Sequence, residues 1–101
     1  MPTYRGLFAA ALVLLGMTAS HHAAAQSGYG QVVLDNQMSV TVDLYVDGRY
    51  GCRALSRLTC TTQEYTGYHV LRAEASDGRS LEQIIENLQQ GEVYSFRVWE
   101  E

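Results

Sequence analysis

The stretch "SVTVDLYVDG", residues 39–48, decides the fold class of this 101-residue chain. Every second residue from position 40 to position 46 is apolar, and this alternation is the pattern of a half-buried β-strand. The Asp47-Gly48 pair that follows is typical of a two-residue hairpin turn, because both residues tolerate a positive φ. We therefore expect residues 49–53 to return antiparallel to this strand. Gly51 within them indicates a bulge or a close approach of two backbones.

Other parts of the chain show extended patterns as well. The segments "YTGYHVLRAEA" (65–75) and "EVYSFRVWE" (92–100) alternate between apolar and polar residues, and a short apolar run occupies 31–34. Asp77-Gly78 is a second pair with the chemistry of a hairpin turn. Four extended runs separated by such turns predict a protein built mainly from β-strands.

One segment has two interpretations. Leu81, Ile84, Ile85 and Leu88 are spaced as on one face of a helix, and Gly91 follows as a stop. An α+β fold with a short helix at 81–89 is therefore the alternative to an all-β fold. Against the helix stand its short length and its two glutamates four residues apart, which repel each other.

The N-terminal segment, residues 1–25, has the pattern of a signal peptide. Arg5 precedes an apolar run, and small residues at 23–25 form a cleavage site. The run of about a dozen residues is shorter than the roughly 20 that a membrane-spanning helix needs, so we expect no span after cleavage. We expect a flexible start at 26–30, a single domain at 31–101 and a periplasmic or secreted location.

Cys52 and Cys60 are the only cysteines in the chain. Export would place them in an oxidising compartment, so we predict a disulfide between them that closes the loop at 54–62. Closing this short ring should stabilise the fold by about 2.5 kcal/mol. Their separation does not match the usual ligand spacing of a zinc site. We expect neither a metal nor a cofactor.

The charge of the chain bears on its partners. Seven Lys and Arg residues stand against eleven acidic ones, for a formal net charge of −4. This balance argues against nucleic acid or an anionic membrane as a partner.

Three arginines spaced by four nevertheless predict a local positive patch after the hairpin. On a strand Arg49 and Arg53 would point the same way, and Arg57 could join them. Tyrosine and arginine together are favoured at binding surfaces. The alternative is that each arginine pairs with a nearby carboxylate, such as Asp43, Asp47 or Glu64. The candidate binding residues are Tyr45, Arg49, Tyr50, Arg53 and Arg57.

His69 is the only histidine beyond the predicted signal peptide. A catalytic base needs a nucleophile and an orienting carboxylate within reach, and no such motif is evident. We expect instead a packed histidine, hydrogen-bonded across the sandwich, and a protein that is not an enzyme.

The spacing of "LYVDGRYG", "TGYHVLRA" and "LQQGEVYSFRV" resembles the PEGA-type domains of secreted bacterial proteins. The resemblance implies an all-β fold, a small antiparallel Ig-like β-sandwich that serves as a non-enzymatic module. It favours an extended 83–89, which we predict to pair with the final strand. The family usually has a threonine–proline pair after the first hairpin, where this chain has Cys52, Arg53 and Ala54. The matching residues are Val46, Asp47, Gly48, Gly51, Gly67, His69, Leu71, Leu88 and Gly91.

These features favour an exported, non-enzymatic binding or structural module of the periplasm or cell envelope, whose partner is an unknown protein or envelope component. The alternative function is a periplasmic inhibitor of a secreted hydrolase. Such an inhibitor would present the disulfide-closed loop to an active site, since a rigid loop loses little entropy on binding.

Overall fold

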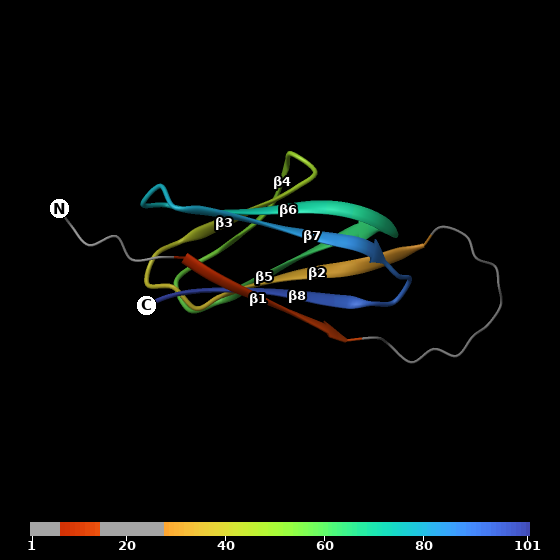
Figure 1. The fold of residues 1–101 in the computed structure, drawn as a ribbon, viewed down its shortest axis with the longest axis horizontal. Helices are drawn as coiled ribbons and strands as arrows, with labels where there is room; N and C mark the ends of the chain where they lie inside the picture. Colours follow the sequence, from red (N-terminus) through yellow and green to blue (C-terminus); the bar gives the residue numbers. More distant parts are fainter. Residues whose placement is uncertain (1–6, 15–27) are drawn as a thin grey trace.

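The protein consists of β-strands packed in two layers (Figure 1). The computed structural model describes residues 7–14 and 28–101, and within these residues it contains no helix. The predicted all-β sandwich is therefore confirmed, and the alternative with a helix at 81–89 is wrong. The strands are β1 (Leu7–Leu14), β2 (Tyr29–Asn36), β3 (Val42–Val46), β4 (Arg49–Ala54), β5 (Thr59–Tyr65), β6 (Gly67–Ala75), β7 (Ser80–Leu88) and β8 (Val93–Glu100).

Two four-stranded sheets form the layers. The first sheet has the order β1-β8-β2-β5, and the second sheet has the order β4-β3-β6-β7. In Figure 1 the second sheet lies above the first. Neighbouring strands are antiparallel with one exception, because β2 and β8 run parallel. A parallel pair needs a long connection. Here the chain between β2 and β8 forms the entire second sheet and β5.

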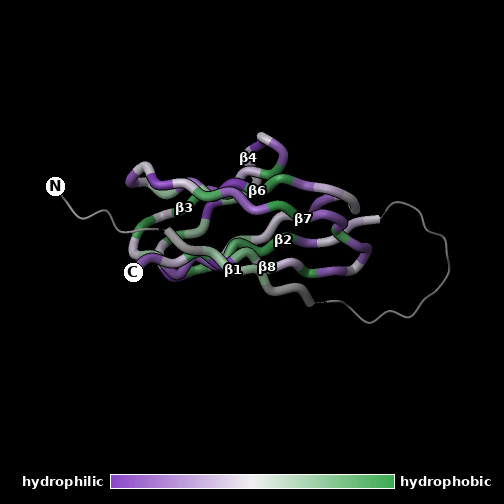
Figure 2. Tube along the Cα trace, in the orientation of Figure 1, coloured by the Kyte–Doolittle hydropathy of each residue, from purple (hydrophilic) through white to green (hydrophobic). Residues whose placement is uncertain are grey.

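The inner faces of the two sheets form the hydrophobic core. Along β3, Val42, Leu44 and Val46 are buried, as the alternation predicts. Hydrophobic and hydrophilic positions alternate along the strands in Figure 2. Each fully buried apolar side chain of this size contributes about 1.5–3 kcal/mol. The largest fully buried apolar side chains are Phe96, Leu34, Met38, Leu44, Leu71 and Leu88.

Strand β7 explains the helix-like spacing at 81–89. It is extended, as expected, but it pairs with β6, so the predicted pairing with the final strand is wrong. Leu88 lies opposite Gly67 and Ile85 lies opposite His69, so three steps along β7 match two along β6. This bulge turns both Ile85 and Leu88 inward, although a regular strand would point them to opposite faces. The spacing therefore reflects a bulged edge strand.

The N-terminal region contains strand β1, which pairs antiparallel with β8. This strand lies within the predicted signal peptide, and cleavage of that peptide stays a prediction. Strand β2 begins at Tyr29, so its first two residues belong to the segment 26–30 for which a flexible start was expected. Among the residues that the structure describes, no helix has the length and apolar character needed to cross a membrane.

Candidate binding site

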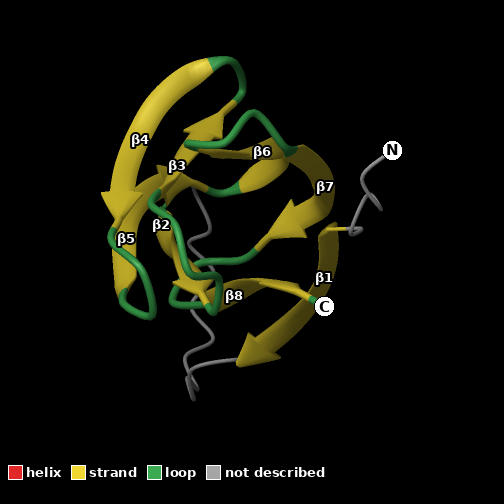
Figure 3. Cartoon of the chain, turned by 90° about the vertical axis from the view of Figure 1, so that its left-hand side faces the viewer, coloured by secondary structure: helices red, strands yellow, loops and turns green. Residues whose placement is uncertain are grey.

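The disulfide between Cys52 and Cys60 is present, with a Cα–Cα separation of 6.0 Å. Cys52 lies on β4 and Cys60 on β5, which are edge strands of different sheets. These two strands run along the same side of the sandwich in Figure 3. The disulfide was expected to close a loop at 54–62, but residues 59–62 belong to β5. It therefore links the two layers, and the turn between the strands contains only residues 55–58.

The hairpin between β3 and β4 has the predicted two-residue turn. Asp47 has a φ of 54° and Gly48 a φ of 84°, the left-handed values that this turn requires. Tyr45 pairs with Tyr50 and Leu44 with Cys52, so Gly51 is an extra residue in β4. The predicted bulge at Gly51 is confirmed. A Cβ atom on Gly51 would lie 3.2 Å from the Leu44 carbonyl oxygen, which is a close backbone approach.

The bulge places Arg49 and Arg53 on opposite faces of β4. Arg49 pairs in register with the buried Val46, whereas Arg53 lies opposite Asp43 on the outer face. The prediction that they point the same way is wrong, because the extra residue between them shifts the alternation by one.

The arginines instead pair separately with nearby groups, which is largely the alternative interpretation. Arg53 Nε donates to Asp43 Oδ1 at 2.8 Å, and Arg49 Nη2 lies 3.9 Å from Glu64 Oε1. Arg57 donates to the backbone carbonyl of Gln37. The three guanidinium groups therefore do not form one patch.

Three of the predicted residues nevertheless share a surface, the hairpin patch, which consists of Tyr45, Tyr50 and Arg53. The rings of Tyr45 and Tyr50 meet edge to face with centroids 5.9 Å apart. The hydrogen bond with Asp43 raises the pKa of the Arg53 guanidinium, and both tyrosines add to this effect. Tyr50 is 57% exposed, so the patch is open to a partner.

A second feature is a hollow beside the hairpin, lined by residues of β2, β4 and β5. This tyrosine hollow has a volume of about 190 Å³. Arg49 and Tyr50 were predicted as binding residues, whereas Tyr29, Glu64 and Tyr65 were not. The residues that define it are Tyr29, Arg49, Tyr50, Thr62, Glu64 and Tyr65.

The walls of the tyrosine hollow come from both sheets. Tyr29 and Tyr65 are register partners on β2 and β5, and their rings stack with centroids 4.9 Å apart. The hydrogen bond to Tyr65 raises the pKa of the Tyr29 hydroxyl. Glu64 is buried, and its Oε2 atom accepts a hydrogen bond from Thr62 Oγ1 at 2.9 Å. The hollow thus combines exposed aromatic rings with one carboxylate and one guanidinium.

His69 connects the hairpin turn to the end of β5. Its Nδ1 atom lies 2.6 Å from Asp47 Oδ2 in the hairpin, and its Nε2 atom lies 2.6 Å from the Tyr65 carbonyl oxygen. The side chain is buried, so the predicted packed, hydrogen-bonded histidine is confirmed. A carbonyl can only accept, so Nε2 carries a proton, and the carboxylate favours a proton on Nδ1 as well.

The pKa values of this pair agree with a charged contact. Burial acts to lower the pKa of His69, but the hydrogen bonds with the Tyr65 carbonyl and with Asp47 outweigh it and raise the pKa. Burial acts to raise the pKa of Asp47, but the Val70 amide and His69 lower it overall. The two contacts of His69 therefore hold the hairpin against the end of β5.

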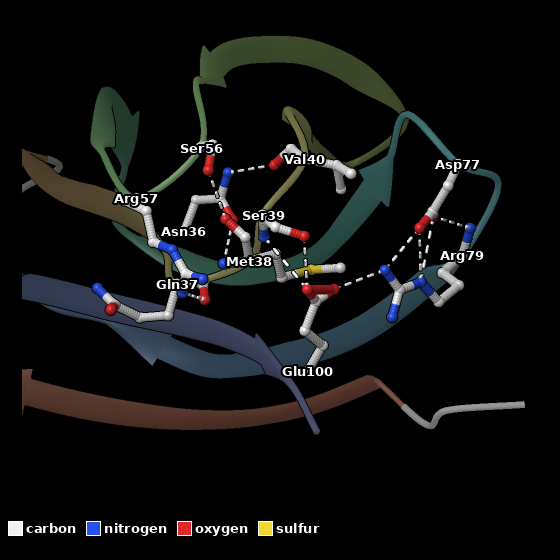
Figure 4. Close-up of polar contacts among 10 residues, drawn as sticks. All are labelled: Asn36, Gln37, Met38, Ser39, Val40, Ser56, Arg57, Asp77, Arg79 and Glu100. Atoms are coloured by element: carbon white, nitrogen blue, oxygen red, sulfur yellow. Dashed lines mark hydrogen bonds and ion pairs between the residues drawn. The ribbon is translucent and has the colours of Figure 1, made fainter.

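The turn at 55–58 is fixed by a buried asparagine, as Figure 4 shows in part. Asn36 is fully buried, and its amide group donates to the carbonyls of Val40, Ala54 and Leu55 at 2.8–3.1 Å. Its Oδ1 atom accepts from the Met38 amide at 2.9 Å. These bonds tie the turn to the segment that follows β2.

Polar side chains of the turn add to this anchoring. Ser56 Oγ donates to the Met38 carbonyl at 2.9 Å, and Arg57, with a φ of 66°, donates to the Gln37 carbonyl (Figure 4). Leu55 and Leu58 are 54% and 56% exposed at the same turn. The turn thus presents two apolar side chains on a fixed backbone.

Comparisons with family models, with curated proteins and with solved structures find no match for this chain. Within residues 7–14 and 28–101, no group of three or more histidine, cysteine, aspartate or glutamate side chains is placed to hold a metal ion. The candidate site has three parts: the hairpin patch, the tyrosine hollow and the turn at residues 55–58, called the anchored turn below.

Proposed function

We propose that this protein is an exported, non-enzymatic binding module of the periplasm or cell envelope. The observation that carries the proposal is the placement of exposed tyrosines around a hairpin that is fixed on both sides. Tyr50 belongs to both the hairpin patch and the tyrosine hollow. Tyrosine gives a large contact area at low cost in side-chain entropy, which suits a binding surface.

Two features support the rigidity of this surface. The Cys52–Cys60 disulfide joins β4 to β5, and the His69 contacts join the hairpin to Tyr65. A surface that is ordered before binding loses less entropy when it associates. The disulfide also supports an oxidising compartment outside the cytoplasm, because such bonds persist there.

An affinity experiment tests this proposal. The exported protein is immobilised, a periplasmic and envelope extract is passed over it, and the retained material is identified. We expect an envelope component that is retained by the wild type and by Tyr68→Ala but released by Tyr50→Ala. Tyr68 is 59% exposed on β6 and belongs to none of the three parts of the candidate site, so it is a matched control. Equal retention by both variants would contradict the proposal.

A likeness to PEGA-type, Ig-like domains is part of the proposal. It is supported by the roles of several matching residues. Gly48, Gly67 and Gly91 have φ values of 84°, 116° and 79°, which favour glycine. Gly51 forms the bulge and His69 is buried. Such domains are non-enzymatic modules, which agrees with the proposed function.

A second candidate function is inhibition of a secreted hydrolase. The observation that favours it is the anchored turn, which exposes Leu55 and Leu58 on a fixed backbone. A hydrolase recovered in the affinity experiment and released by Leu55→Ser would support inhibition. Ile84→Ser is the control, because Ile84 is 49% exposed on β7, away from the turn. If Ile84→Ser released the hydrolase equally, the turn would not be the inhibitory element.

A further inference from the structure

The polar groups of the tyrosine hollow have a spacing that selects one kind of ligand group. Arg49 Nη2 and Glu64 Oε1 are 3.9 Å apart, which is longer than a hydrogen bond of about 2.7–3.2 Å. An oxygen atom about 2.8 Å from each of them would complete a triangle of reasonable geometry. A group at that point must accept a hydrogen bond from the guanidinium and donate one to the carboxylate.

A neutral hydroxyl meets both requirements, because it donates one hydrogen bond and also accepts. A carboxylate or phosphate oxygen could accept from Arg49 but would be repelled by Glu64. An ammonium group could donate to Glu64 but would be repelled by Arg49. The two side chains carry opposite charges, so the hollow gives neither an anion nor a cation a net electrostatic advantage.

The tyrosine rings define the rest of the ligand. Tyr29, Tyr50 and Tyr65 are 47%, 57% and 62% exposed. The faces of aromatic rings are electron-rich and attract weakly positive C–H groups. The hollow, at about 190 Å³, is smaller than the roughly 300–1,000 Å³ of pockets for drug-sized ligands, so it suits a single ring. A pyranose with equatorial hydroxyls combines flat C–H faces with hydroxyls at its edge.

We infer that the tyrosine hollow binds one ring of a neutral saccharide, with a hydroxyl between Arg49 and Glu64 and the C–H face of the ring against tyrosine. This inference rests on the proposed binding function and names the ligand class of its site. The partner is then a glycan of the envelope. Its neighbouring rings extend from the hollow along Tyr50, the exposed tyrosine of the hairpin patch.

A titration with defined probes tests the inference. The exported protein, labelled with ¹⁵N, is titrated with cellobiose and with N,N′-diacetylchitobiose, and amide shifts are followed by NMR. Glucuronic acid and trilysine serve as anionic and cationic probes. We expect the neutral disaccharides to shift the amides of Arg49, Tyr50, Glu64 and Tyr65 and to bind more tightly than either charged probe.

Variants separate ring contacts from unspecific effects. Tyr65→Ala should weaken disaccharide binding roughly tenfold, because it removes an exposed aromatic wall. Tyr68→Ala removes an equally exposed tyrosine outside the hollow and should bind like the wild type. Tighter binding of a charged probe, no binding of either disaccharide, or equal effects of the two substitutions would overturn the inference. If the affinity experiment then recovers a protein partner that is released by Tyr50→Ala, the proposed binding function holds and only the glycan inference fails.

Discussion

The buried His69 side chain and the exposed Asp47 carboxylate form a contact of 2.6 Å that joins strand β6 to the turn of the β3–β4 hairpin. The second ring nitrogen of His69 bonds the Tyr65 carbonyl, so the same imidazole also reaches the first sheet. Both bonds need a proton on the ring. The contact therefore links the protonation of one residue to the position of the hairpin that carries the proposed binding surface.

The pH dependence of stability should report this contact. The pKa of His69 is raised above its ordinary value of 6.5, so its contribution is complete below that pH and is lost as the pH rises through the folded-state pKa. The pKa of Asp47 is lowered below 3.8, so its contribution is present above that pH and is lost on further acidification. The pair should thus stabilise most between these two values.

Urea unfolding of the wild type and of His69→Gln across this pH range checks the prediction. The free energy of unfolding of the wild type should fall as the pH rises above 6.5, and that part of the fall should be absent in His69→Gln. Glu64 also raises the pKa of His69, and it is unchanged in the variant. Parallel curves for the two proteins would show that His69 is not protonated in the folded state.

The disulfide should contribute about 2.5 kcal/mol to the free energy of unfolding, because it restricts the unfolded chain. Urea unfolding with and without reductant measures this difference, and a Cys52→Ser, Cys60→Ser double variant should match the reduced wild type. Mass spectrometry of the exported protein should find both thiols bonded. Free thiols at both positions would contradict the proposed compartment and this account of stability.

Asn36→Ala should lower the free energy of unfolding by about 3 kcal/mol. The substitution leaves the carbonyls of Val40, Ala54 and Leu55 without the amide that bonds them, in a place where Asn36 is fully buried. Asn87→Ala is the control, because Asn87 is exposed on β7 and should change stability by no more than about 0.5 kcal/mol. Urea unfolding measures both. A small effect at Asn36 would mean that water replaces its bonds.

The exported protein should begin at Gln26, because the predicted signal peptide ends at Ala25. N-terminal sequencing of protein recovered from the periplasm checks this. Cleavage removes β1, so the first sheet of the exported protein should retain β8, β2 and β5. A recovered protein that still begins at Met1 would show that β1 is a permanent strand of the first sheet.

Much of the fold was predictable because its signals are local. The alternation around Leu44, the Asp47-Gly48 turn and the bulge at Gly51 each depend on a few neighbouring residues, and all three are confirmed. The register between strands could not be predicted in the same way, because it depends on residues that are far apart in the sequence. The helix-like spacing of Ile85 and Leu88 results from a bulge that only the pairing with β6 reveals.

The candidate site was predictable only in part, for the same physical reason. The bulge at Gly51 was expected, but its effect on the direction of Arg49 depends on which residue of β3 faces it. The hollow depends on the pairing of Tyr29 with Tyr65, which are far apart in the sequence. The signal in the sequence that could have suggested a common surface is that both residues are tyrosines, a residue type that is frequent at binding surfaces.

The central claim is that the hairpin patch binds a partner, and Arg53→Glu tests it most directly. Arg97→Glu is the matched control. Arg53 and Arg97 both pair with an aspartate through Nε, at 2.8 Å and 2.9 Å, and their side chains are 59% and 55% exposed. Only Arg53 belongs to the hairpin patch.

The measurement is the affinity of each variant for the partner recovered by the affinity experiment, together with its melting temperature. Arg53→Glu should weaken binding roughly fivefold or more, as expected for an interface anchor. Arg97→Glu should bind like the wild type, and neither substitution should change the melting temperature much, because exposed ion pairs contribute little. Binding that survives Arg53→Glu, or a loss that only follows unfolding, would contradict the claim and leave the hairpin as a structural element alone.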